Sequence, residues 1–165
     1  YSALHEQAVL LGELGIEYEV VPGVSSFQAA AAVLKRELTV PQVSQTVILT
    51  RLEGRTPVPE GEKLEKLARS GATLCVFLSA GMIDRVVEAA AAHYPWTTPA
   101  AVVYRASWPD QQVVTGSLAD IAGKAKAAMM ERQSMILIGR ALGAHAARSN
   151  LYHRGFGHGF REKAP

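Results

Sequence analysis

The spacing of apolar positions along the chain predicts short helices that alternate with short strands. Residues 2–14 carry Leu4, Leu11 and Leu14 at helical spacing, and Gly15 is a suitable stop for that helix. Further helices are predicted over residues 25–36, 60–69, 82–92 and 118–131. Apolar runs predict strands over residues 16–21, 45–50, 73–78, 99–104, 111–115 and 135–138. Strands that alternate with helices favour a layered α/β domain.

The expected fold class is α/β, with a mixed and mostly five-stranded sheet flanked by helices. The short strand at 111–115 follows the turn residues Pro109 and Asp110, which predicts a hairpin with the strand before it. A hairpin requires one antiparallel pairing, so the sheet is expected to be mixed rather than purely parallel. Ser79 and Ser117 precede predicted helices and are candidate N-caps.

Residues 21–32 read as a strand, a tight turn and a helix. Pro22 restricts its own φ and Gly23 tolerates a positive φ, which together predict a sharp corner. Ser25 or Ser26 can cap the following helix, whose free N–H groups and nearby hydroxyls suit a small polar ligand group. An ordinary strand-to-helix connection is the alternative for this stretch.

Composition limits the classes of function. The chain has 165 residues, 48% of them hydrophobic, which fits one domain or one and a fraction. No apolar run approaches the roughly 18 residues that span a membrane, no secretory signal is visible, and Cys75 lies in an apolar run. A net charge of +2 gives no indication of nucleic-acid binding. We therefore expect a cytoplasmic protein with neither a membrane nor a nucleic acid as partner.

Several segments carry a family resemblance that extends nearly end to end. The most specific are residues 21–32, which read VPGVSSFQAAAA, and residues 53–62, which read EGRTPVPEGE; residues 45–51, 77–80, 103–110 and 138–140 add to them. Together they resemble the tetrapyrrole (corrin/porphyrin) methylases. The resemblance implies that residues 1–15 are the last helix of a mostly absent N-terminal domain. It also implies that residues 16–165 are the C-terminal α/β domain of that fold.

The resemblance implies a function as well. Its specific segments favour S-adenosylmethionine-dependent methyl transfer to C11 of precorrin-4 or cobalt-precorrin-4 in cobalamin biosynthesis, by a homodimer. The implied cofactor is S-adenosyl-L-methionine, and its predicted contacts are Ser25, Ser26, Leu78, Ala106 and Met135, with Ser134 a weaker candidate. Plain core packing is the alternative for Leu78 and Met135. No catalytic residue can be named.

Three arginines are candidates for binding the substrate. Arg51, Arg55 and Arg105 lie at predicted strand ends or in the loop beyond, and a planar guanidinium binds both oxygens of a carboxylate. Because tetrapyrroles of this type carry many carboxylates, these side chains are the predicted substrate contacts. A solvated surface position is the alternative for each of them.

Other features favour less specific roles. His145, His153 and His158 match no familiar ligand spacing, so no metal site is predicted. Trp96 and Trp108 are expected to pack in the core or at an interface. Two alternative functions remain: a non-catalytic dimerisation or binding module, and a methylase of the same superfamily that acts on uroporphyrinogen, diphthine or ribosomal RNA.

Overall fold

The computed structural model describes residues 2–143 and Gly157. The helices are α1 (Ser2–Glu13), α2 (Ser26–Leu34), α3 (Leu64–Ala68), α4 (Ile83–Ala91) and α5 (Ile121–Ala127). The strands are β1 (Val47–Arg51), β2 (Thr73–Phe77), β3 (Pro99–Tyr104), β4 (Gln112–Ser117) and β5 (Ser134–Ile138). Short 3-10 turns cover Glu60–Glu62, Ala80–Met82 and Arg140–Gly143. The candidate histidines His145, His153 and His158 lie outside the described residues.

Within the described residues one five-stranded sheet has the order β1-β2-β5-β3-β4. β1 pairs with β2 in parallel, whereas the β2–β5, β5–β3 and β3–β4 pairs are antiparallel. β1, β2 and β3 therefore run in one direction and end at the same edge, where β5 begins. The mixed five-stranded sheet and the hairpin between β3 and β4 are confirmed.

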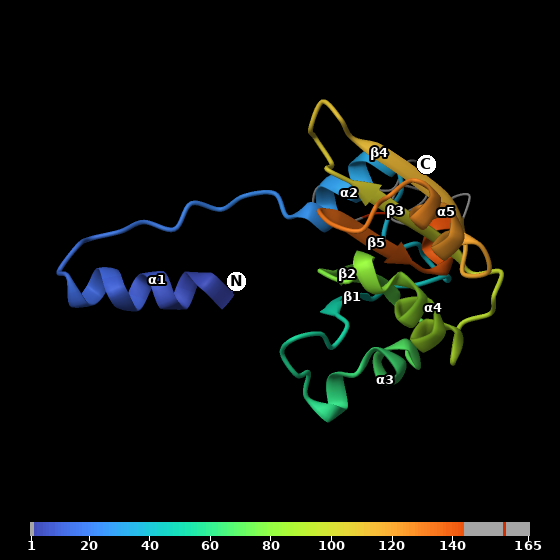
Figure 1. Cartoon of the computed structure of the whole chain (residues 1–165), viewed down its shortest axis with the longest axis horizontal. Helices are drawn as coiled ribbons and strands as arrows, with labels where there is room; N and C mark the ends of the chain where they lie inside the picture. The colour runs from blue at the N-terminus through green and yellow to red at the C-terminus, as the bar shows by residue number, and fades with distance from the viewer. Residues whose placement is uncertain (1, 144–156, 158–165) are drawn as a thin grey trace.

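Alternation along the strands gives the sheet two apolar faces, each covered by helices. Leu74, Val102 and Ile136 pack with α3, α4 and α5 on one face. Cys75 follows Leu74 and Leu137 follows Ile136, and successive side chains of a strand point to opposite faces. Cys75 and Leu137 therefore pack with α2 on the other face. The result is three layers, with α2 on the face that adjoins the site described below (Figure 1). Leu142, in the turn after β5, packs on the same face.

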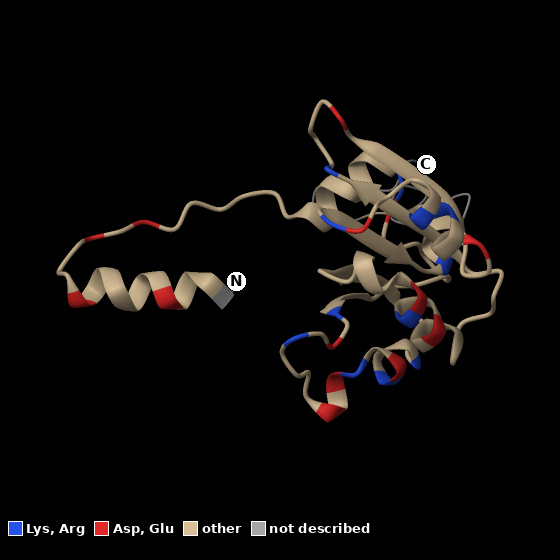
Figure 2. Cartoon of the chain, viewed as in Figure 1, with Lys and Arg blue, Asp and Glu red and all other residues tan. Residues whose placement is uncertain are grey.

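An N-terminal arm, formed by α1 and residues 14–25, extends away from these layers (Figure 1). The strand predicted at 16–21 is wrong, because this segment pairs with no strand among the described residues and its side chains are exposed. The corner predicted at Pro22 and Gly23 is also wrong, since no turn is formed there and Gly23 is not among the residues with positive φ. The described part of the arm carries glutamates but no aspartate, lysine or arginine (Figure 2).

Some predicted helix boundaries need correction. The helix expected over 60–69 is divided at Lys63, whose ψ of 138° is incompatible with a continuing helix. The helix expected from 118 starts only at Ile121, because Ser117 still pairs with Pro99 in the sheet and Asp120 occupies the N-cap position. Ser79 does not cap α4, whose N-cap position is Met82.

No helix in the part of the chain that the structure describes has both the length and the apolar character needed to cross a lipid bilayer.

Candidate functional site

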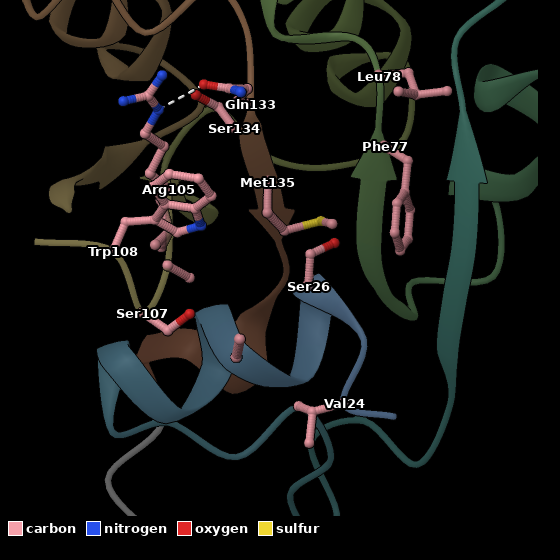
Figure 3. Close-up of a pocket in the computed structure, with 13 residues that line it drawn as sticks. Val24, Ser26, Phe77, Leu78, Arg105, Ser107, Trp108, Gln133, Ser134 and Met135 are labelled. Atoms are coloured by element: carbon pink, nitrogen blue, oxygen red, sulfur yellow. Dashed lines mark hydrogen bonds between the residues drawn. The ribbon is translucent and has the colours of Figure 1, made fainter. Parts of the chain in front are cut away.

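A cavity of about 420 Å³ opens at the sheet edge where β2 and β3 end and β5 begins. Side chains from four segments converge on it (Figure 3). The lining residues are Val24, Ser26, Ala29, Phe77, Leu78, Val103, Arg105, Ala106, Ser107, Trp108, Gln133, Ser134 and Met135. Ligands of α/β sheets commonly bind outside the carboxyl ends of strands, so the location itself favours a binding site.

The start of α2 forms one wall of the cavity. Ser25 takes the N-cap position with an extended backbone (φ −73°, ψ 152°), as the sequence predicted for this pair of serines. Its backbone N–H donates to Oε1 of Gln28 at 3.1 Å, which fixes the first turn. Ser26 follows inside the helix and points into the cavity near Met135 (Figure 3). A polar ligand group placed there would meet a hydroxyl and the positive end of a helix.

The end of β2 forms the opposite wall. Leu78 has a left-handed backbone (φ 54°) and is 86% exposed, so the alternative of core packing is wrong for this residue. Ser79 behind it is fully buried. Its hydroxyl donates to the carbonyl of Phe77 at 2.7 Å and accepts the N–H of Leu52 at 2.9 Å. These two bonds hold the strand end in place, so Leu78 is presented to the cavity.

The beginning of β5 forms the floor. Met135 is only 4% exposed and belongs to the core between α2 and the sheet, yet it also lines the cavity. Met135 therefore both packs in the core and lines the cavity. Ser134 precedes it and also lines the cavity. The floor thus combines an apolar thioether with a hydroxyl.

The turn after β3 brings Ala106 to the cavity. Neither its backbone N–H nor its carbonyl has a hydrogen-bond partner within residues 2–143 and Gly157. A small side chain leaves this donor and acceptor open to a ligand, and contact of Ala106 with a cofactor stays a prediction. An adenine edge also presents a donor beside an acceptor, which suits such a pair.

Strained backbone is concentrated around this cavity. Seven described residues other than glycine have positive φ, and four of them line the cavity: Leu78, Arg105, Ser107 and Gln133. Such conformations are unfavourable for residues with a Cβ and persist where surrounding contacts impose them. Their gathering at one cavity indicates that its shape has a function.

The family described as Tetrapyrrole (Corrin/Porphyrin) Methylases matches residues 1–122. The chain belongs to the tetrapyrrole methylases. It is 49% identical over 164 residues to a cobalt-precorrin-4 C(11)-methyltransferase of Methanocaldococcus jannaschii, covering 98% of this chain and 63% of the relative. It is 48% identical over 162 residues to a precorrin-4 C(11)-methyltransferase of Pseudomonas aeruginosa. This match covers 98% of this chain and 65% of the relative.

A solved structure confirms the fold of this tetrapyrrole methylase. The crystal structure of a cobalamin biosynthetic enzyme, cobalt-precorrin-4 methyltransferase, matches with a TM-score of 0.82 and 46% identity. The match covers 86% of this chain and 60% of that one. The chain therefore spans less than two thirds of the length of these relatives.

The structure brings together four of the five residues that the resemblance assigned to the cofactor in this methylase. Ser26, Leu78, Ala106 and Met135 line the cavity, and Ser25 adjoins it as the N-cap of α2. Their contact with a cofactor stays a prediction. Their convergence from separate parts of the sequence shows that they share one site.

The three arginines do not share that site. Arg105 lines the cavity, but Arg51 donates instead to the carbonyls of Leu52, Thr56 and Pro57 at 3.3, 3.1 and 2.9 Å. Arg51 therefore organises the loop that follows β1. Arg55 is exposed within that loop. Substrate contact stays a prediction for all three.

Sequence reasoning assigned no binding role to seven residues that line the cavity: Val24, Ala29, Phe77, Val103, Ser107, Trp108 and Gln133. Phe77 and Gln133 flank residues that were named, and neither has a motif of its own. Trp108 was expected to pack in the core or at an interface, but it is 58% exposed and lines the cavity, so a core position is wrong. Trp96 is 55% exposed, so a core position is wrong for it too.

Proposed function

We propose that this chain forms the S-adenosylmethionine-binding part of an enzyme that methylates C11 of precorrin-4 or of cobalt-precorrin-4. One observation carries the proposal: residues assigned to the cofactor by resemblance alone converge on a single cavity at the ligand-binding edge of the sheet. The names of the relatives support the substrate class, and they include both the cobalt-free and the cobalt-containing form.

The residues present suit this cofactor. The cavity volume of about 420 Å³ lies in the range of about 300–1,000 Å³ that is typical of small-molecule sites. The open backbone groups of Ala106 suit the edge of an adenine, and the N-terminus of α2 at Ser26 suits a carboxylate. Phe77, Leu78 and Met135 supply apolar surface between them. Donors, acceptors and apolar walls are thus all available for a nucleoside joined to an amino acid.

The contribution of the protein to methyl transfer is alignment. S-adenosylmethionine, when bound, supplies an electrophilic methyl group together with its own leaving group. The left-handed strand end at Leu78 and the turn at Ala106 both line the cavity and would restrict the orientation of a ligand bound there. Met135 and Phe77 keep water from the inner part of the cavity. Good alignment alone is worth about 7–11 kcal/mol of the barrier in well-oriented reactions.

We propose further that the activity requires a protein of the relatives' length, in which additional residues complete the site. The relatives are half as long again as the part that this chain covers, which supports this view. The homodimer expected from the resemblance stays a prediction, and light scattering of the purified protein measures it.

The test is calorimetric titration with S-adenosylhomocysteine, in this chain and in a version extended to the length of the relatives. We expect saturable binding with one site per chain. Ala106→Leu fills the cavity and should abolish binding, whereas Ala119→Leu adds the same atoms at an exposed position away from the cavity and should leave it unchanged. Absence of binding in both versions, or equal binding by both variants, would contradict the proposal.

The reaction itself is tested with the extended version. Incubation with S-adenosylmethionine and precorrin-4, or its cobalt form, should give a product that carries one additional methyl group at C11, detected by mass spectrometry and NMR. Binding of the cofactor without methylation of either tetrapyrrole would support the cofactor site but reject the substrate.

A further inference from the structure

We propose that Arg105 is a positioning residue that shapes the cofactor cavity, and that it does not act as a substrate ligand. This inference rests on the proposed function, because the cavity must bind S-adenosylmethionine for its shape to matter. The side chain was predicted from the sequence to bind a substrate carboxylate. Its surroundings favour a different role.

The guanidinium of Arg105 already has partners inside the protein. Nε donates to Oε1 of Gln133 at 2.5 Å, and Nη1 donates to Oδ2 of Asp110 at 2.5 Å. The same group lies 5.2 Å from the ring centroid of Tyr104 and 5.3 Å from that of Trp108. Asp110 already neutralises this cation, and Nη2 is the only nitrogen of the guanidinium for which no hydrogen-bond partner is found among the described residues. The charge of Arg105 is therefore used internally.

The backbone of Arg105 ties the same segments together. Its N–H donates to the carbonyl of Gln133 at 3.0 Å, and its carbonyl accepts the N–H of Trp108 at 3.0 Å. Both Arg105 and Gln133 have left-handed backbones, with φ of 44° and 52°. Two bonds between Arg105 and Gln133, one from the backbone and one from the side chain, hold these strained residues against each other.

These contacts place two parts of the cavity. The turn that Arg105 closes carries Ala106, with its open N–H and carbonyl, and Trp108, whose ring lies beside the guanidinium (Figure 3). Gln133 is the residue before Ser134 on the floor. Loss of the guanidinium would leave the backbone bond from Arg105 to Gln133 but remove the side-chain bonds to Gln133 and Asp110, so the spacing between the wall and the floor of the cavity would be held less firmly.

The experiment uses fluorescence from a single tryptophan. The chain has two tryptophans, so Trp96→Phe leaves Trp108 as the reporter. In this background Arg105→Met should weaken binding of S-adenosylhomocysteine about tenfold or more. Without ligand, it should also increase quenching of Trp108 by acrylamide, since one ring face loses its cover. Arg105→Lys should not restore binding, because one ammonium cannot reproduce a planar fork that reaches two partners.

Two further variants make the result specific. Asp110→Asn is nearly isosteric and removes the charge that pairs with Arg105, and it should weaken S-adenosylhomocysteine binding in the same direction as Arg105→Met. Arg132→Met removes a neighbouring cation that does not line the cavity, and it should leave both readouts unchanged. In the extended enzyme, the KM for the tetrapyrrole should change less than the affinity for the cofactor.

Each failure has its own signature. An unchanged cofactor affinity in Arg105→Met together with a large rise in the KM for the tetrapyrrole would overturn the inference and restore the role of substrate ligand. Unchanged quenching of Trp108 in Arg105→Met would overturn it as well. If the parent protein does not bind S-adenosylhomocysteine while quenching still rises, the proposed function fails and the positioning contact stands.

Discussion

Replacement of Ser79 by alanine tests how the strand end at the cavity is held. The buried hydroxyl makes two hydrogen bonds, to the Phe77 carbonyl at 2.7 Å and from the Leu52 N–H at 2.9 Å. The first joins neighbours in sequence, whereas the second joins the end of β1 to the end of β2. Ser79→Ala keeps Cβ and removes both bonds, and it leaves the Leu52 N–H without its acceptor.

The expected cost follows from these two bonds. A hydrogen bond of this kind contributes about 1 kcal/mol, so Ser79→Ala should lower the free energy of unfolding by about 2 kcal/mol. If the free energy of unfolding falls by about 2 kcal/mol per molar urea, the urea concentration at the midpoint of unfolding should fall by about 1 M. Urea unfolding followed by circular dichroism measures this shift.

The matched control is Ser70→Ala. Its hydroxyl also makes two local bonds, to the Leu67 carbonyl at 2.8 Å and from the Ala72 N–H at 3.3 Å, but the residue is exposed and water can replace them. A change within about 0.5 kcal/mol is expected. Equal losses in the two variants, or no loss in Ser79→Ala, would refute the reasoning that burial makes the Ser79 bonds important.

Further predictions concern stability and the buried thiol. Thr73 is fully buried and its hydroxyl has no partner among the described residues, so Thr73→Val should raise the free energy of unfolding by about 1 kcal/mol, measured with urea; a loss would show that the hydroxyl is bonded. Gly139 has a φ of 155° and a Cβ there would lie 3.0 Å from Cα of Thr73, so Gly139→Ala should lower the melting temperature, and an unchanged value would contradict this contact. Burial raises the pKa of Cys75 from 9.0 to about 12 and that of Tyr94 from 10.0 to about 12. Because both groups ionise first in the unfolded chain, stability should fall as the pH rises from about 9 towards 12, and Tyr94→Phe should reduce that slope in urea titrations. Iodoacetamide at pH 8 should label Cys75 only as fast as the protein opens, and rapid labelling of the folded protein would contradict its burial.

Local signals account for the elements that the sequence predicted well. The β3–β4 hairpin follows from Pro109 and Asp110 between two apolar runs, and the start of α2 follows from Ser25 before a run of helix-forming residues. Both depend on neighbours in sequence. Residues 16–21 have the composition of a strand but no partner strand among the described residues, because strand formation depends on tertiary context.

Part of the candidate site was predicted from the family resemblance and not from local sequence signals. Ser26, Leu78 and Ala106 were named from the resemblance, and residue type alone would not have selected Leu78 or Ala106. Left-handed backbone at Leu78 and Gln133 could not be predicted either, because neither leucine nor glutamine prefers it. Long-range contacts impose those conformations, and a single sequence does not display them.

The position of β5 has a consequence for how the protein is made. β5 is the last strand of the described chain, yet it lies at the centre of the sheet and joins β2 to β3. While the ribosome is still synthesising residues 134–138, the β1–β2 pair and the β3–β4 hairpin have no hydrogen-bonded connection with each other. The nascent chain therefore holds two exposed strand edges until β5 emerges, and these edges are open to association with other chains. Insertion of β5 closes both edges in a single step, so the two parts of the sheet become one only after residues 134–138 are available.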